Sequence, residues 1–202
     1  DTVGALWLWS FFEWEGFRTT NLTLPLLDVI TVNYDAINTE DKNRTDDSDL
    51  HGITVTARGA DKRGYLLADH SLQGTPEEAA DMVIRVFNAY QADQVILEKN
   101  NGGDWIPLVL RTKQPGLPIT TVWASRGKRT RAEPISAFYE RKKISHFGVL
   151  SEVEKELTSW VPGRISPGRL DSLVWGFSYL FPLHTGNGII DLAPVGWNDD
   201  NT

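Results

Sequence analysis

The most informative part of this chain is the stretch Val95-Ile96-Leu97-Glu98-Lys99-Asn100-Asn101-Gly102-Gly103-Asp104-Trp105. Its first three residues form a short apolar run that predicts a buried strand, so Glu98 stands at the carboxyl edge of that strand. Open α/β sheets bind their ligands at this edge, where a carboxylate is placed to hold a metal or a proton. In the alternative interpretation the two glycines form an ordinary turn, Asp104 caps the next helix and Glu98 is merely solvated.

Two other carboxylates occupy comparable positions. Asp35 follows the β-branched run at 29–34, which is too short for a helix and predicts a strand. Asp171 lies early in a helix that we expect Ser166 to cap and Pro167 to open, beside an apolar stripe of Leu170, Leu173, Val174 and Phe177. Hard Mg²⁺ or Mn²⁺ ions prefer oxygen ligands, and crowded carboxylates repel one another without a cation. Asp35, Glu98 and Asp171 therefore form a candidate divalent-metal site for phosphodiester hydrolysis.

Short motifs along nearly the whole chain carry a family resemblance. In order they are Gly4 to Trp7, Val32 to Ala36, Asp49 to Ile53, Gly64 to Asp69, Glu98 to Asp104, Ala124 to Arg129, Arg131 to Pro134 and Ser166 to Trp175. Each is weak alone, but their ordered succession resembles the nuclease domain of the large terminase subunit of tailed bacteriophages, the DNA-packaging motor. The resemblance implies an α/β fold with a ribonuclease H-like mixed β-sheet flanked by helices.

The same resemblance implies that the catalytic and metal-binding acids are Asp35, Glu98 and Asp171. The family usually has a proline after its first aspartate, whereas Ala36 follows Asp35 here. Asp46, Asp47 and Asp49 therefore remain alternatives for the first acid, and Asp49 is also a candidate outer ligand or water-positioning acid. We expect two Mg²⁺ or Mn²⁺ ions, one activating the attacking water and the other stabilising the leaving 3′ oxygen.

Length and composition indicate one domain over residues 1–202. The chain is 41% hydrophobic, which is enough for one sizeable core. Within it we expect residues 1–28 to be a linker-derived N-terminal segment, rich in aromatic residues that partly cover the core, and residues 186–202 to be a loop-like tail. No apolar run is long enough to cross a bilayer. The absence of cysteine excludes disulfides and thiolate metal sites, and the four histidines lack ligand spacing.

Charge is distributed unevenly. A net charge of −7 argues against a general nucleic-acid coat, so any DNA contact must be local. The segment at 126–143 carries seven basic residues against two acidic ones. We expect Arg126, Lys128, Arg129 and Arg131 to bind DNA, since a loop at 125–131 containing Gly127 lets the backbone approach a phosphate. A solvated helical face explains residues 141–143 equally well.

The remaining pattern predicts alternating strands and helices. Strands are expected at about 29–35, 52–58, 64–70, 94–98 and 119–123, and helices near 104–111 and 131–142. A further helix should begin after Thr75, which is followed by Pro76 and two acids, and run to about Tyr90. Trp160 and Trp175 lie among aliphatic residues and are expected to fill core. Three early strands followed by alternation fit a mixed sheet.

These features predict an endodeoxyribonuclease that cuts concatemeric viral DNA during packaging. No phosphate-binding GxxxxGK[ST] motif is present, so the chain should not hydrolyse ATP unaided. By resemblance its partners are double-stranded DNA, an ATPase domain of the same full-length polypeptide, the portal protein and the small terminase subunit, with no membrane. The expected location is the host cytoplasm, transiently at the procapsid portal. The alternatives are another ribonuclease H-like nuclease, such as a junction resolvase or transposase core, and a noncatalytic module that docks on DNA or portal.

Overall fold

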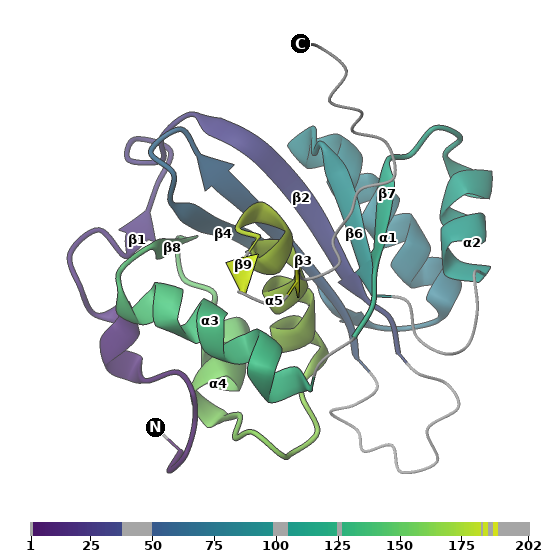
Figure 1. The fold of residues 1–202 in the computed structure, drawn as a ribbon. Coiled ribbons are helices and arrows are strands. Elements are labelled where there is room, and N and C mark those ends of the chain that lie inside the picture. Colours follow the sequence, from purple (N-terminus) through teal and green to yellow (C-terminus); the bar gives the residue numbers. More distant parts are fainter. Residues whose placement is uncertain are drawn as a thin grey trace.

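A mixed β-sheet runs through the molecule and carries helices on both faces (Figure 1). The computed structural model describes residues 2–37, 50–98, 105–124 and 127–182, together with the backbone of 184–185 and 188–189. Its elements are η1 (Trp9–Phe12), β1 (Arg18–Thr19), β2 (Leu27–Asp35), β3 (Leu50–Gly59), β4 (Gly64–Asp69), β5 (Leu72–Gln73), α1 (Pro76–Tyr90), β6 (Gln94–Glu98), α2 (Trp105–Lys113), β7 (Ile119–Val122), α3 (Lys128–Glu140), β8 (Ile144–Phe147), α4 (Ser151–Ser159), α5 (Gly168–Leu180), β9 (His184–Thr185) and β10 (Gly188–Ile189).

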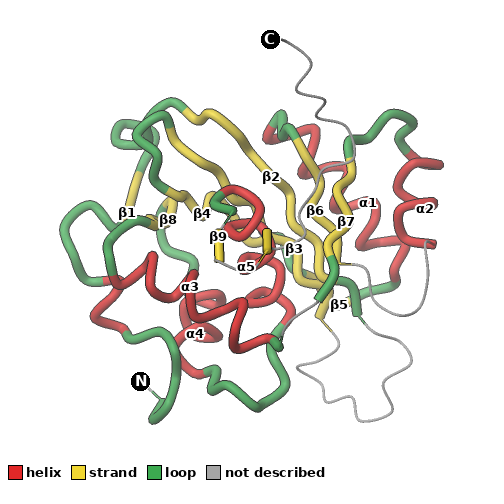
Figure 2. The backbone as a smooth tube through the Cα atoms, viewed as in Figure 1, coloured by secondary structure: helices red, strands yellow, loops and turns green. Residues whose placement is uncertain are grey.

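The sheet has the strand order β1-β8-β4-β3-β2-β6-β7, with β5 paired to β3. Strands β2, β3 and β4 form an antiparallel meander, whereas β6 joins β2 and β7 joins β6 in parallel. At the opposite edge of the meander, β8 pairs with β4 and β1 pairs with β8, both in parallel. The tube in Figure 2 shows the three central strands running side by side through the body of the molecule. This arrangement confirms the expected α/β class with a mixed sheet.

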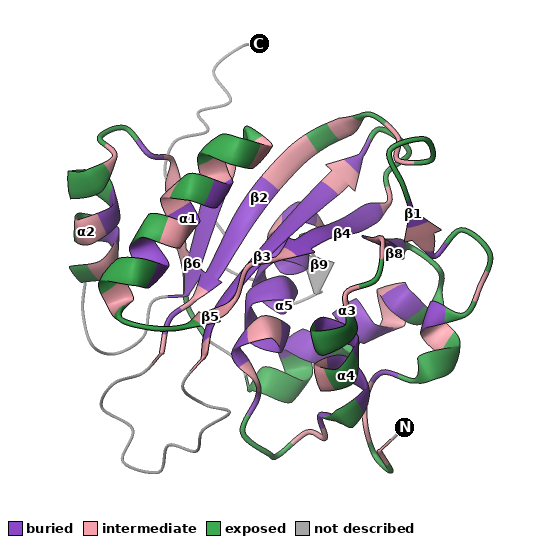
Figure 3. Ribbon diagram, turned by 180° about the vertical axis from the view of Figure 1, so that it is seen from behind, coloured by how far each residue is buried: buried purple, intermediate pink, exposed green. Residues whose placement is uncertain are grey.

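Different helices cover the two faces of the sheet, and a separate hydrophobic core lies under each set (Figure 3). On one face α1 and α2 pack over an aliphatic core that includes Val32, Val55 and Leu97. On the other face α5 lies against the central strands, with α3 and α4 packed beside it around an aromatic core that includes Tyr139 and Phe177. Because side chains alternate along a strand, every second residue of β2, β3 and β6 faces α5. No helix in the described ranges is long and apolar enough to span a membrane.

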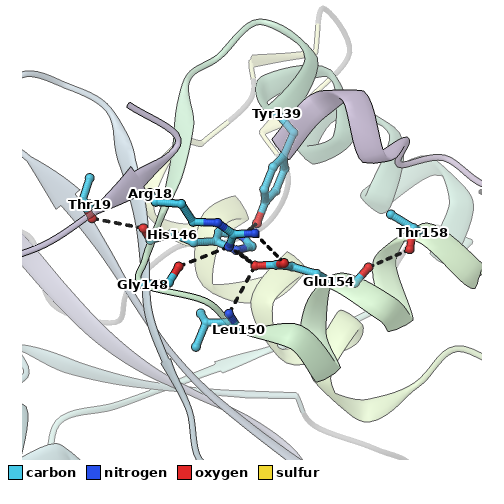
Figure 4. A network of polar contacts seen from close by, with 8 residues as sticks. All are labelled: Arg18, Thr19, Tyr139, His146, Gly148, Leu150, Glu154 and Thr158. Carbon is cyan, nitrogen blue, oxygen red and sulfur yellow. Dashed lines mark hydrogen bonds and ion pairs between the residues drawn. The ribbon is translucent and has the colours of Figure 1, made fainter. Parts of the chain in front are cut away.

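The N-terminal segment is held to the sheet by a buried polar network (Figure 4). Glu154 on α4 pairs with Arg18 of β1 and accepts a hydrogen bond from His146 of β8. Since a carboxylate only accepts, His146 Nδ1 carries the proton and Nε2 accepts from the Tyr139 hydroxyl. Trp7, Phe12 and Phe17 of the same segment are buried in the aromatic core. The aromatic start thus covers this face of the domain.

Most expected elements are confirmed. The strand at 94–98 and the helix to Tyr90 have the expected bounds, and Thr75 and Glu78 form a reciprocal capping box. Helix α3 differs, because it begins at Lys128 rather than 131 and so absorbs most of the expected loop. Strand β8 and helix α4 were not predicted. Trp160 and Trp175 are buried as expected. Of the expected loop-like tail only the two-residue strand β10 lies within the described residues.

Candidate active site

Three carboxylates meet where β2 and β6 end. Tyr34 is the register partner of Leu97 on the parallel neighbour, so Asp35 and Glu98 leave the sheet side by side. The Glu98 carboxyl group lies close enough to raise the pKa of Asp35. Helix α5 crosses the same face and brings Asp171 to the pair from its first turn. The structure therefore brings together the three acids that the sequence singled out, two from strand ends and one from a helix start.

A buried polar layer separates α5 from the sheet just behind these acids. Asn33 accepts a hydrogen bond from Thr31 at 2.8 Å and donates to Thr54 and Thr56 at 3.3 and 3.0 Å. Ser172 of α5 donates to Thr54 across the interface at 3.0 Å. A buried polar group is stable only when its partners are present, so this layer fixes α5 in one register on the sheet. That register sets the position of Asp171 relative to Asp35.

Glycine makes the close approach of α5 possible. A side chain on Gly52 of β3 would collide with the backbone carbonyl of Gly168, the first residue of α5. A side chain on Gly176 would collide in the same way with Asn33. Both contacts involve atoms that have no room to move, since the polar layer holds Asn33 and the helix holds Gly168. The absence of two side chains thus lets the helix and its aspartate reach the sheet.

The acids perturb one another electrostatically. Burial raises the pKa of Asp35 well above its ordinary value, and the negative charges of Asp171 and Glu98 raise it further. Lys128 opposes this effect from the start of α3. Burial alone would lower the pKa of Lys128, but Asp171, Asp35 and Glu98 outweigh it and raise that pKa. The site therefore concentrates negative charge and attracts a cation.

Glu98 is held by Trp175 and Arg131. The indole N–H of Trp175 donates to its Oε2 at 2.8 Å, and Arg131 Nη1 lies 3.6 Å from its Oε1. The Arg131 guanidinium also lies over the Trp175 ring, 4.2 Å from its centroid. Arg131 and Glu98 are 7% and 9% exposed, so this is a buried ion pair. These contacts fix the direction in which the Glu98 carboxylate points.

Asp171 is paired differently. Its Oδ2 accepts a hydrogen bond from the Ser166 hydroxyl and lies 2.6 Å from the Lys128 ammonium, which also donates to Ser166. Ser166 was expected to cap α5, but Pro167 occupies the cap position and no side chain caps this helix. The hydroxyl instead binds the aspartate one turn later. Its role is to orient Asp171 rather than to begin the helix.

The donor chemistry fits a hard divalent cation. Three carboxylates offer oxygen ligands on one side of α5, and the mutual repulsion at Asp35 would be relieved by a positive ion. As the side chains stand, however, no three acidic or imidazole groups among the described residues form a finished metal cage. Lys128 already occupies the position next to Asp171. A metal bound at Asp171 Oδ2 would therefore take the place of that ammonium.

The basic residues expected to bind DNA differ in their surroundings, and Lys128 contacts Asp171. Arg129 is exposed and forms a surface ion pair with Glu133 at 2.6 Å, which leaves it accessible to a phosphate. Arg131 lies within α3 and faces Glu98 and Trp175 instead of solvent. Asp49 and Arg126 lie outside the described residues, as do Asp46, Asp47 and Asp104. The contributions of Trp175 and Ser166 to the site were not foreseen.

Comparison with known proteins identifies the fold. The family model of the terminase RNase H-like domain matches residues 39–175. The chain is similar to the large terminase nuclease from the thermophilic phage G20c. With cobalt bound, that nuclease shows 11% identity and a TM-score of 0.62 over 88% of this chain and 98% of that chain. With magnesium bound, the values are 14% and 0.55 over 82% and 89%.

A longer relative has the same fold. The large terminase from a second thermophilic bacteriophage gives 13% identity and a TM-score of 0.59 over 83% of this chain and 43% of that chain. No curated protein sequence matches the chain significantly. The expected ribonuclease H-like fold is thus confirmed by both the family model and the solved structures. With its family match covering more than half of its length, the chain belongs to the terminase RNase H-like domain family.

Proposed function

We propose that this domain is a metal-dependent endodeoxyribonuclease that cuts concatemeric viral DNA during packaging. The observation that carries the proposal is the convergence of Asp35, Glu98 and Asp171 from three separate elements onto one buried, negatively charged point. Such a cluster is costly to a fold that does not use it, because like charges repel in a poorly solvated site. The comparison with known proteins also supports divalent-metal binding by this domain, since the similar G20c nuclease has been solved with cobalt and with magnesium bound.

In this proposal the three carboxylates hold two Mg²⁺ or Mn²⁺ ions. When bound, such ions lower the pKa of water to make a nucleophile and stabilise the charge on the leaving 3′ oxygen. The chain's own groups perform the positioning. Trp175 and Arg131 orient Glu98, Ser166 orients Asp171, and the polar layer below α5 fixes the spacing between the strands and the helix. Preorganised ligands of this kind cost little reorganisation during the reaction.

The DNA backbone is proposed to run along the start of α3. Lys128 and Arg129 lie in its first turn, and the Lys128 ammonium contacts Asp171, so this end of α3 adjoins the acidic site. Arg126 precedes them in the sequence. Such a basic track beside an acidic centre would guide a phosphate toward the metal. We further propose that the domain works in the host cytoplasm with an ATPase domain of the same polypeptide, the portal protein and the small terminase subunit.

Paired substitutions test the metal site. Replacing Asp35 by Asn removes a repelling charge but keeps the shape, so the metal-free protein should melt at the same or a higher temperature. Nicking of supercoiled plasmid with Mn²⁺ should disappear, as it should for Glu98→Gln, because a missing ligand removes transition-state stabilisation. Glu77→Gln, an exposed change on the opposite face, is the matched control.

The melting temperature with and without Mn²⁺ completes this test. An ion that binds only the folded state stabilises it, so the wild-type protein and Glu77→Gln should gain on Mn²⁺ addition and the two site variants should gain less. Variants at Asp35 and Glu98 that still nick DNA would refute the proposed site. A folded wild-type protein that neither binds Mn²⁺ nor nicks would instead favour the noncatalytic docking interpretation.

A further inference from the structure

Lys128 stands at the mouth of the carboxylate site. Its ammonium lies 2.6 Å from Asp171 Oδ2 and also donates to the Ser166 hydroxyl. The Lys128 side chain is 48% exposed, whereas that of Asp171 is only 5% exposed. One end of this ion pair is therefore buried and fixed, and the other rests on a flexible four-carbon stem in contact with solvent.

The charges around the three acids show what Lys128 does in the metal-free protein. Of the two described cations at the site, Arg131 faces Glu98 and is turned away from solvent by Trp175. Lys128 is thus the cation that serves Asp171, and it also attracts Asp35. Without it, three converging carboxylates would share one buried arginine. The ammonium therefore acts as the counter-ion that lets Asp35 and Asp171 approach each other before any metal arrives.

A divalent ion bound at Asp171 Oδ2 would compete with this ammonium. Asp171 Oδ2 already accepts from Lys128 and from Ser166, so an ion that binds there has to displace the ammonium. Two cations in contact with one oxygen would repel each other strongly in a partly buried site. The half-exposed stem of Lys128 allows the ammonium to swing out into water at small cost, which the buried guanidinium of Arg131 cannot do.

We propose that Lys128 is a built-in stand-in cation: its ammonium holds Asp171 until a divalent metal displaces it, and so lowers the affinity of the empty site for metal. This inference rests on the proposed function, because it assumes that the carboxylates bind a divalent ion. In this inference Lys128 first positions Asp171, and after metal displaces its ammonium the side chain is available to contact the DNA backbone.

The test compares Lys128→Met with Lys128→Arg and with Lys143→Met. Lys143 is an exposed lysine of the same basic segment. It directly precedes β8, and its carbonyl accepts a hydrogen bond from the Gly64 amide at the start of β4, away from the ends of β2 and β6. Its replacement therefore removes the same charge at a distance from the site. The dissociation constant for Mn²⁺ is measured by calorimetry on the folded full chain, and the melting temperature is measured without metal.

Lys128→Met should bind Mn²⁺ at least about tenfold more tightly and should melt earlier without metal, because the competitor and the counter-ion are both gone. Lys128→Arg should restore both values toward wild type, and Lys143→Met should change neither. A residue with a merely structural role would lower the melting temperature without tightening Mn²⁺ binding.

The outcomes separate this inference from the proposed function. Unchanged or weaker Mn²⁺ binding by Lys128→Met, in a wild-type background that binds Mn²⁺ and nicks DNA, overturns the stand-in role alone. Mn²⁺ binding that appears only in Lys128→Met supports the stand-in role even if the wild-type protein does not nick. Absence of Mn²⁺ binding in every variant, including wild type, overturns both.

Discussion

The buried network around Glu154 allows a quantitative prediction about stability. Replacing Glu154 by Gln keeps the size of the side chain and an oxygen that can accept from His146, but it removes the negative charge that pairs with Arg18. Only 2% of the Glu154 side chain is exposed, so solvent screens the lost interaction weakly. The perturbation therefore acts on the contact that joins β1, β8 and α4.

The pKa of Glu154 gives the size of the effect. Burial alone would raise the pKa of this carboxyl, but Arg18 and His146 outweigh burial and lower the pKa from 4.5 to about 2. Each unit corresponds to about 1.4 kcal/mol, so the ionised group contributes about 3 kcal/mol to the free energy of unfolding. Because the folded pKa is the lower one, this contribution is present above pH 4.5 and is lost as the pH falls toward 2. By about pH 3 it should be about half as large.

Urea denaturation of wild-type and Glu154→Gln proteins at about pH 7, 5 and 3 measures this difference. The variant should be less stable by about 3 kcal/mol at neutral pH, and the gap should narrow as the solution is acidified. Glu152→Gln is the control, since Glu152 is exposed on the same helix and its loss should change stability by less than about 0.5 kcal/mol. The reasoning would be refuted if Glu154→Gln lost no more stability at neutral pH than Glu152→Gln, or if its loss of stability did not change with pH.

Two further predictions concern the site itself. Trp175→Phe removes the N–H that donates to Glu98 but keeps an aromatic ring beneath Arg131. Because a buried carboxylate then loses a charge-assisted hydrogen bond, the free energy of unfolding measured in urea should fall by about 2 kcal/mol. Arg129→Gln should reduce the slope of log binding constant against log salt by about 0.9, as measured by DNA titration, because one phosphate contact is lost. An unchanged slope would leave Arg129 as the surface partner of Glu133 alone.

The sequence predicted correctly those features that depend on a few neighbouring residues. Glu98 could be placed at a strand edge because Val95 to Leu97 form an apolar run of strand length, and the structure ends β6 at that residue. Thr75 and Glu78 specify their helix start through contacts only three residues apart. Asp35 and Glu98 could be expected at one edge because both follow strands. Each of these inferences depends on a few neighbouring residues.

Other features depend on contacts between distant residues. Strand β8 is short and has a histidine at its centre, and His146 is stable there only because Tyr139 and Glu154 provide its hydrogen bonds. Helix α3 begins at Lys128 although Pro134 lies in its middle, where proline usually costs a hydrogen bond. The proline is better suited to a first turn, which favours the later start expected from the sequence. Packing of Ile135 and Tyr139 in the core offsets that preference.

The two cations at the site differ in a way that assigns them different tasks. Arg131 is buried, lies over an indole ring and faces Glu98, so moving it would leave an unpaired charge on each side of the broken contact. Lys128 is half exposed and shares Asp171 with a serine hydroxyl that stays behind when the ammonium leaves. In our proposal Glu98 therefore keeps one geometry when metal binds, while Asp171 exchanges its partner. Under this proposal the site remains folded when empty and still accepts a divalent ion, because only Lys128, the more exposed of its two described cations, has to move.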